Sequence, residues 1–498
     1  MHEQKWDAMS EKDFDAMLSG SIPELPPQEA VRGVTPWKRA MNFVLVGMAL
    51  GTVTLQFWHL QYILPVIGLV LCLLGFRTLR RENGWFEACF LLAALRCVCL
   101  SPARILDTTI LQPSVMTQSV GLVLAVVNTL LQFAGFFCLW RGLLAVQRKA
   151  GLPPRAGAAF ALLIWYALLC ALGLVQYSGW IISIAMVAGY VLILRSIYKI
   201  SKSLAEAGYA IRPAAVRVPD WGVALTLAGV LVMGCAAGYL FGSSVPMDWQ
   251  AAEQAEQAEQ AETAVIKAHL LELGFPEDVL RDLTAEELTA CKDALRVVVD
   301  TQYDRPDSKR KMQQELSTPL RLTGIAVELA GEEERWVIIH HFLWVGDPEF
   351  FGTESLQLWP AYQIPTSGWT AAGPVTGRVL HDRDGQTYAA PYYFTGERAY
   401  PNSSSPNQSL TDFFAGFSLP RQGENRRGYL LYSMTATEAG SMISSWLGYT
   451  HQYTWRQYPA TSTAWERQMA SPASNFLGAF TRVQAALQFR PEETKLQP

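Results

Sequence analysis

Two adjacent histidines near two acidic side chains are the most metal-like group in this sequence. His340 and His341 precede Asp347 and Glu349, and imidazole and carboxylate groups are common ligands of Zn²⁺. The surrounding run RWVIIHHFLWV, however, has the period of a β-strand, whose neighbouring residues point to opposite faces. We therefore expect the two histidines to lie on opposite faces of a central strand and to share no metal ion.

A second acidic group occurs in HDRDGQ. Asp382 and Asp384 precede Gly385, as in the first part of a calcium-binding loop, but the later acidic ligand of such a loop is missing. The same residues suit the turn of a hairpin formed by GRVLHDRDGQTYAAPYYF, and we expect a hairpin. No GxSxG, phosphate-binding loop, HExxH or spaced Cys/His set occurs. We therefore predict no catalytic residue and no cofactor, and we do not expect an enzyme.

Aromatic side chains give the clearest sign of a binding surface. The second half of the chain is rich in them, and those between residues 446 and 465 do not follow a strand period. Aromatic faces beside polar groups bind sugars and peptides. We predict that these residues bind an envelope polysaccharide or a peptide, and burial in a β-sandwich core is the alternative. The predicted ligand-binding residues are Trp446, Tyr449, Tyr453, Trp455 and Tyr458.

Two ionisable residues interrupt an apolar run, WFEACFLLAALRCVCL. Glu87 lies near one end of it and Arg96 near the other. An ionisable group inside a membrane span is costly, so a functional site is the default hypothesis. Positions near the ends of the run favour the alternative, in which both side chains reach the membrane surface.

The N-terminal tail carries a possible docking motif for a protein partner. Phe14, Met17 and Leu18 recur at helical spacing among acidic residues, as in a short amphipathic helix that binds a cytoplasmic protein. A tail that touches the bilayer is the alternative.

The elements around these residues begin with apolar runs. Half of the residues are hydrophobic and only 17% are charged, which is typical of membrane spans joined to a soluble domain. The runs predict about seven transmembrane helices. They cover residues 40–58, 59–76, 85–100, 118–140, 156–176, 179–194 and 222–243.

Charge placement predicts the orientation of these spans. The tail and the three loops on its side of the bilayer carry 17 Lys and Arg, whereas the loops on the other side carry only Arg104. Lys and Arg concentrate in cytoplasmic loops. We therefore predict a multi-pass protein of the cell membrane, with its N-terminus in the cytoplasm and residues 244–498 outside it. Those residues carry 21 Lys and Arg against 32 Asp and Glu, which argues against a nucleic-acid partner.

Four domains follow from this layout. Residues 1–39 form the cytoplasmic tail and residues 40–243 the transmembrane domain. Residues 244–315 are predicted to form a helical stalk and a small helical module. Residues 316–498 are predicted to form an all-β, sandwich-like extracytoplasmic domain of roughly eight strands.

The stalk and the helical module are predicted from local signals. AAEQAEQAEQAETAV, at residues 251–265, contains good helix formers without Gly or Pro, as in a solvated helical rod. Replication slippage in a tolerant linker is the alternative. In the module, Thr284 and Glu287 have the spacing of a capping box. An apolar helical face should follow, formed by Leu288, Cys291, Leu295 and Val298.

Two hypotheses of function are compatible with this organisation. In the first, a non-enzymatic membrane protein presents an extracytoplasmic β domain that binds an envelope or external ligand and signals to a partner at the cytoplasmic tail. In the second, the chain is a component of membrane transport or assembly, with the β domain as an accessory. The lipid bilayer is a partner in both.

Overall fold

The chain divides into two compact units in the computed structural model. The first comprises Met1–Ile105 and Pro113–Met233, and the second comprises Leu106–Gln112 and Gly234–Pro498. We call them the helical unit and the β unit. The structure describes residues 36–52, 60–175, 177, 179–209, 211, 218–252, 261–304, 320–346, 348–402, 405–457, 460–470 and 478–491.

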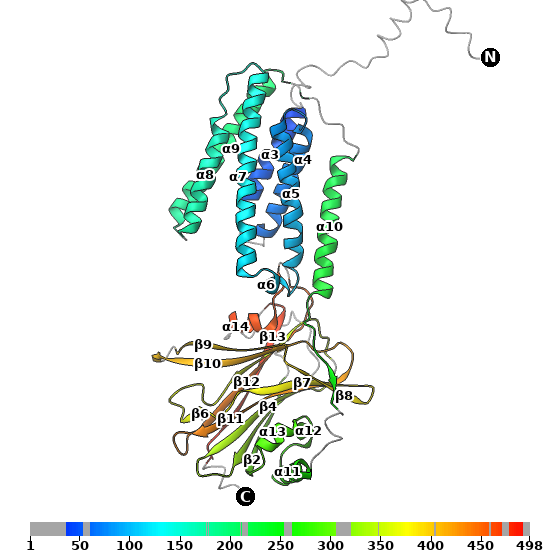
Figure 1. Cartoon of the computed structure of the whole chain (residues 1–498), viewed down its shortest axis with the longest axis vertical. Coiled ribbons are helices and arrows are strands. Elements are labelled where there is room, and N and C mark those ends of the chain that lie inside the picture. Colours follow the sequence, from blue (N-terminus) through cyan, green and yellow to red (C-terminus); the bar gives the residue numbers. More distant parts are fainter. Residues whose placement is uncertain are drawn as a thin grey trace, which may run out of the picture. The chain divides into compact units, whose positions relative to one another are not determined.

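Long apolar helices form the helical unit (Figure 1). Among the described residues, six helices are long and apolar enough to cross a membrane. In each of them the backbone polar groups are satisfied within the helix, as the hydrocarbon core requires. The six helices are α4 (Leu60–Leu79), α5 (Gly84–Leu106), α7 (Gln118–Lys149), α8 (Gly157–Leu174), α9 (Trp180–Glu206) and α10 (Asp220–Phe241).

The first of the seven predicted spans, residues 40–58, is not confirmed. It corresponds to α3 (Pro36–Thr52), which has 17 residues. At 1.5 Å per residue this helix extends about 26 Å, less than the ~30 Å of a bilayer's hydrocarbon core. Residues 53–59, which complete the predicted span, lie outside the described residues. The third predicted span, in contrast, is longer than 85–100, since α5 continues to Leu106.

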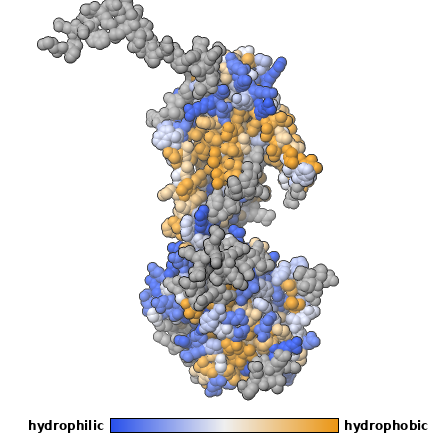
Figure 2. Space-filling view, turned by 180° about the vertical axis from the view of Figure 1, so that it is seen from behind, coloured by the Kyte–Doolittle hydropathy of each residue, from blue (hydrophilic) through white to orange (hydrophobic). Residues whose placement is uncertain are grey.

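Glycines bring α3 and α4 close together. A Cβ atom on Gly47 would lie 2.5 Å from the carbonyl oxygen of Gly68, and one on Gly68 would lie 2.5 Å from that of Gly47. Small residues at such contacts let transmembrane helices approach each other. The outward surface of the helices is broadly hydrophobic (Figure 2), as expected for side chains in contact with lipid.

Two antiparallel sheets form the β unit. The larger sheet has eight strands in the order β1-β8-β7-β11-β4-β3-β2, with β6 paired to β11, and the smaller has the order β13-β12-β5-β10-β9. The strands of the larger sheet are β1 (Gln250–Ala251), β2 (Ala294–Asp304), β3 (Leu320–Leu329), β4 (Arg335–Trp344), β6 (Trp369–Ala371), β7 (Thr376–Arg383), β8 (Gln386–Pro391) and β11 (Glu424–Ala436). Those of the smaller sheet are β5 (Glu354–Trp359), β9 (Phe394–Asn402), β10 (Ser405–Phe417), β12 (Ile443–Gln452) and β13 (Phe480–Phe489).

Two hydrophobic cores lie on opposite faces of the larger sheet. One fills the space between the two sheets. The other lies between the larger sheet and α11 (Ala261–Glu272), α12 (Glu277–Leu280) and α13 (Ala285–Ala290). Strand β4 contributes Ile338 to the first core and Ile339 to the second. The prediction of a central strand with two apolar faces is therefore confirmed. A fourth helix, α14 (Ala464–Ala470), contacts β5, β10 and β12.

Local turn and capping signals are confirmed as well. β7 and β8 form the predicted hairpin, in which Arg383 is paired with Gln386. Asp384 and Gly385 have φ angles of 52° and 78°, the left-handed values that a tight two-residue hairpin turn requires. Thr284 and Glu287 form both hydrogen bonds of the capping box.

Two predictions about this half of the chain are wrong. The described part of residues 316–498 has eleven strands, β3 to β13, and not roughly eight. The expected helical face through Val298 ends early: α13 stops at Ala290, and residues from Ala294 form β2, because the consecutive Val297, Val298 and Val299 suit a strand paired with β3.

The predicted stalk is tested only at its two ends. β1 pairs with β8 at Gln250 and Ala251, so the chain joins the sheet there. Residues 261–265 begin α11, whose following Ile266 and Leu270 pack against the sheet. Residues 253–260, the centre of the repeat, lie outside the described residues.

Candidate functional site

The five aromatic residues predicted to bind a ligand do not form one surface. Trp446 and Trp455 are exposed, at 38% and 42%. Tyr449 lies on the other face of β12 from Trp446 and is buried between the sheets. The Tyr453 hydroxyl donates a hydrogen bond to a backbone carbonyl at 2.7 Å, and Tyr458 lies outside the described residues. Ligand binding by these residues stays a prediction.

The two ionisable residues of the third span lie apart on α5. Glu87 is in the first turn of the helix, where a carboxylate interacts favourably with the helix dipole. Arg96 is near the middle, and its Nε donates to Asn128 Oδ1 at 3.3 Å while its Nη1 donates to Gln132. A role for either residue stays a prediction. The tail residues Phe14, Met17 and Leu18 lie outside the described residues.

The adjacent histidines face opposite sides of β4, as expected. His340 Nε2 is 2.7 Å from Ser445 Oγ in the core between the sheets. His341 Nε2 donates to Asp282 Oδ2 at 3.0 Å on the other face. Asp347 lies outside the described residues. Within the described part of the chain, no group of three or more His, Cys, Asp or Glu could hold a metal ion.

The contact of His340 with Ser445 is not arranged for nucleophilic catalysis. The Ser445 hydroxyl donates to the carbonyl oxygen of Trp359 at 3.2 Å, so His340 must donate to the serine oxygen. In a Ser–His catalytic pair the serine donates its proton to the histidine. Burial also lowers the pKa of His340 to about 3, which keeps the imidazole neutral. This pair stabilises the core.

A polar cleft on the helix-covered face of the larger sheet is the best candidate site. It has a volume of about 610 Å³, within the range of small-ligand pockets. We call it the Asp282 cleft. Its described lining residues are Ala252, Thr263, Lys267, Asp278, Arg281, Asp282, Leu283, Thr284, Ala285, Glu286, Leu288, Thr289, Leu343, Arg378, Leu380, Asp382, Thr387, Asn425 and Arg427.

Strand register places the charged side chains in this cleft. Tyr429 of β11 is paired with His341 of β4 on one side and with Arg378 of β7 on the other. These three residues therefore form one row across three neighbouring strands. Arg427, two positions earlier on β11, points to the same face. The turn after α12 then carries Asp282 to this face of the sheet.

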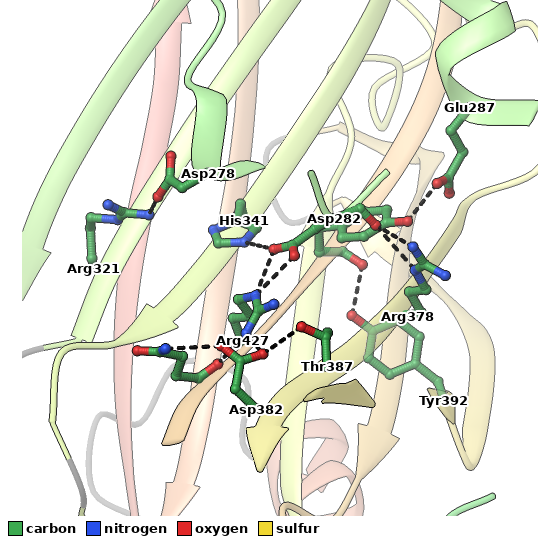
Figure 3. A network of polar contacts seen from close by, with 12 residues as sticks. Asp278, Asp282, Glu287, Arg321, His341, Arg378, Asp382, Thr387, Tyr392 and Arg427 are labelled. Carbon is green, nitrogen blue, oxygen red and sulfur yellow. Dashed lines mark hydrogen bonds and ion pairs between the residues drawn. The ribbon is translucent and has the colours of Figure 1, made fainter. Parts of the chain in front are cut away.

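Asp282 is the centre of the network (Figure 3). Its side chain is 2% exposed. Arg427 Nε donates to both carboxylate oxygens, at 2.9 and 3.0 Å, and His341 donates to one of them. Arg378 donates twice to the backbone carbonyl oxygen of Asp282, at 3.1 and 2.6 Å. Arg427 also pairs with Asp382 at 2.9 Å. The buried charge is thus compensated on several sides, as a buried ion requires.

The same contacts shift the pKa values of the outer groups. Burial alone would raise the pKa of Asp382, but hydrogen bonds from Asn425 and Arg427 outweigh it and hold the pKa below its usual value. At Asp278, burial would also raise the pKa, but the hydrogen bond and the charge of Arg321 outweigh burial and lower the pKa. Burial lowers the pKa of Arg427, yet its contacts with Asp282 raise it overall. The pKa shifts therefore favour the charged forms of Asp278, Asp382 and Arg427.

This arrangement suits binding better than catalysis. Both carboxylate oxygens of Asp282 already accept hydrogen bonds, so it is poorly placed to accept a substrate proton. Around it, the rim carries exposed charges of both signs, including Arg281 and Glu286. None of the described residues that line the cleft is aromatic. A polar ligand with charges of both signs fits this lining.

Sequence reasoning missed this site because its residues are far apart in the chain. Asp282 and Arg427 are 145 positions apart, and Asp282 and Arg378 are 96 apart. The one local signal was the pair Arg426 and Arg427 directly before the apolar part of β11, since a buried strand rarely carries a charge without a partner.

Comparisons with known proteins do not define a class. No protein-family model and no curated protein matches the chain. Among solved structures, a "Pore forming protein" matches with 8% identity and a TM-score of 0.20, covering 39% of this chain and 92% of that one. The "Clostridium perfringens NetB toxin in the membrane inserted form" matches with 8% identity and a TM-score of 0.17, covering 40% and 98%. Likenesses of this size support no argument about function.

Proposed function

We propose that this chain is a non-enzymatic, multi-pass membrane protein that binds a short peptide in the Asp282 cleft of its β unit. The six apolar helices indicate association with a membrane. The observation that carries the ligand proposal is the cleft itself, with the ion pairs of Asp282, Arg427 and Asp382 at its base and a free volume of about 610 Å³ beside them.

The charges of the cleft favour a peptide over a polysaccharide. A short peptide has an ammonium group, a carboxylate and a polar backbone, and the rim offers both Glu286 and Arg281 to such groups. Sugar sites usually contain aromatic faces, whereas none of the described lining residues is aromatic.

The network also reduces the side-chain entropy that is lost when a ligand binds. Arg378 and Arg427 are held in place by Asp282 before any ligand arrives. Side chains that are already ordered lose little freedom on binding, so more of the contact energy appears as affinity.

The proposal places the β unit outside the cytoplasm and the tail inside it. The support is the charge asymmetry of a seven-span layout in which α3 also crosses the bilayer, with 17 Lys and Arg on one side against one on the other. Signalling to a partner at residues 1–39 would need a route through the spans, and α5 offers one, because its last residue, Leu106, folds with the β unit.

A thermal-shift screen tests the ligand proposal. Full-length protein in mild detergent is incubated with di-, tri- and tetrapeptides, free amino acids and oligosaccharides. We expect at least one peptide to raise the unfolding temperature, since a ligand that binds only the folded state stabilises it. The charge reversals Arg281→Glu and Glu286→Lys should weaken that peptide by roughly tenfold each, about 1.4 kcal/mol.

Two exposed residues outside the described cleft lining serve as matched controls. Arg456→Glu and Glu332→Lys make the same charge changes and should leave peptide affinity unchanged. A shift caused by oligosaccharides alone, or peptide affinity that both cleft reversals leave intact, would overturn the proposal.

A further inference from the structure

A pocket in the middle of the helical unit surrounds Arg96. It has a volume of about 320 Å³ and lies between α3, α4, α5 and α7. Its described lining residues are Gly47, Met48, Gly51, Thr52, Pro65, Gly68, Leu69, Cys72, Arg96, Cys99, Leu100, Ala103, Leu124, Val127, Asn128, Leu131 and Gln132.

Arg96 carries the only charge of this described lining. It lies twelve residues from the start of α5 and ten from its end, so each end of the helix is roughly 15–18 Å away. Arg96 thus lies near the middle of a helix that is long and apolar enough to cross a membrane. An ionisable group inside a membrane span is costly and is a functional-site hypothesis by default.

The neighbours of Arg96 do not neutralise this charge. Its hydrogen-bond partners are the side-chain amides of Asn128 and Gln132, and in the described part of the helical unit no carboxylate pairs with it. A guanidinium has five N–H donors, of which these amides use two. The group is thus oriented by neutral partners, and it retains both its charge and free donors for an anion.

Most of the remaining lining is apolar, and part of it belongs to the outward face of a helix. Leu69, Leu100 and Leu131 form part of the wall. Leu124 and Val127 also line the pocket, yet each is 41% exposed on the outward face of α7. In a membrane-spanning helix that face contacts lipid. A molecule that reaches the pocket by this side comes from the bilayer and has an apolar body.

We propose that this pocket binds the anionic group of a bilayer amphiphile, a carboxylate or a phosphate, with Arg96 as its counter-ion. Arg96 forms charge-assisted hydrogen bonds with the anion, Asn128 and Gln132 fix the guanidinium, and the apolar wall takes the first part of the acyl chain. This site is separate from the Asp282 cleft, so it can fail or succeed independently of the proposed function.

Binding of radiolabelled oleate to full-length protein in mild detergent tests the proposal. We expect saturable binding of one oleate per chain, displaced by phosphatidylglycerol but not by phosphatidylcholine or by inorganic phosphate. Arg96→Gln should weaken oleate by about tenfold or more, because a hydrogen bond to a charged group contributes ~1.5–3 kcal/mol. Arg96→Lys, which keeps the charge, should lose less.

Two further variants separate binding from folding. Val127→Trp narrows the lateral opening at an exposed position and leaves Arg96 intact, so it should weaken oleate without lowering the unfolding temperature. Arg104→Gln removes the other arginine of α5, which lies over the Tyr62 ring, and should have no effect on oleate.

Three results would overturn the proposal. They are equal oleate affinity in Arg96→Gln and the unchanged protein, equal displacement by phosphatidylcholine and phosphatidylglycerol, and displacement by inorganic phosphate. The last result would assign the site to a free anion.

Discussion

At the scale of single residues, the β unit is organised around a buried carboxylate. Asp282 is almost fully buried, and its charge is balanced by Arg427 and by a hydrogen bond from His341. Such a pair adds little net stability compared with apolar packing, but removing one partner leaves an uncompensated buried charge. The effect of a mutation here should therefore depend strongly on which partner is removed.

A double-mutant cycle measures this dependence. Arg427→Met should lower the free energy of unfolding of the β unit by about 3–5 kcal/mol, whereas the double variant Asp282→Asn/Arg427→Met should cost clearly less than the sum of the single changes. Arg383→Met, at an exposed pair with Asp384, serves as control and should cost at most about 1 kcal/mol. Additive effects at Asp282 and Arg427 would contradict the network.

Two other histidines make stability sensitive to mild acid. Burial lowers the pKa of His340 to about 3 and, with Arg426, that of His381 to about 4, both from 6.5. The unfolded chain therefore binds more protons below pH 6.5, and stability falls as pH drops from 6.5 toward 4. For His340 the slope approaches about 1.4 kcal/mol per pH unit.

Unfolding of His340→Gln from pH 8 to pH 4.5 checks this prediction. The variant should unfold with a shallower pH dependence than the unchanged protein. At pH 8 the histidine is uncharged in both the folded and the unfolded state. The difference in unfolding free energy between the variant and the unchanged protein at that pH therefore gives the structural effect of the substitution. The buried Glu354, whose pKa is raised by burial, acts in the opposite sense, so the readout is the difference between the two slopes. Parallel curves would refute the account of His340.

At the scale of elements, the connection after α5 has an unexpected position. Leu106–Gln112 follows a predicted membrane span but folds with the β unit. Thr461 donates its backbone N–H to Asp107 O at 2.8 Å and its hydroxyl to Thr108 O at 2.7 Å. Ile110 donates its N–H to Gly242 O at 2.8 Å. Side-chain and backbone hydrogen bonds thus fix this segment in place.

Thr461→Val tests how firmly the segment is held. The variant keeps its shape and the backbone hydrogen bond but loses the one to Thr108, so unfolding free energy should fall by about 1 kcal/mol. Amide hydrogen exchange in residues 106–112 should become faster. Thr481→Val, at a half-buried position on β13, should leave exchange in this segment unchanged. Unaltered exchange in Thr461→Val would show that Thr461 does not hold the connection.

Comparison of the predicted elements with the observed ones shows which features local sequence signals can predict. Local periods correctly indicated the apolar helices, the two-faced strand β4 and the β7–β8 hairpin, because each signal lies within one element. The period failed where Leu288, Cys291, Leu295 and Val298 fit a helical face, since pairing of β2 with β3 decides the outcome there. Helix propensity of the AEQ repeat likewise gave no sign of β1, which two residues form by pairing with β8.

The candidate site lies beyond local signals altogether. Asp282, Arg378 and Arg427 come together only through the register of β7 and β11 and the turn after α12. The pairing and register of strands cannot be predicted from a single sequence when several apolar strands could pair with one another. Arg96 was singled out from the sequence, but its partners Asn128 and Gln132 were not, because they lie 32 and 36 positions away on α7.

At the scale of the whole molecule, the account describes a membrane-spanning helical unit and a β unit that carries a ligand cleft. The helical unit has a hydrophobic outer surface and a charged pocket inside. We propose that the β unit lies outside the cytoplasm, where a peptide ligand can reach the Asp282 cleft.

Sidedness labelling in intact cells tests that claim most directly. Cysteines are introduced separately at Glu332, in the exposed turn between β3 and β4, and at Arg155, in the exposed connection between α7 and α8. A membrane-impermeant thiol reagent is applied before and after lysis, with the unmodified protein as control for its own cysteines, of which Cys99 is exposed. The account predicts labelling of Glu332→Cys in intact cells and of Arg155→Cys only after lysis. The reverse pattern would place the β unit in the cytoplasm and contradict the proposed function.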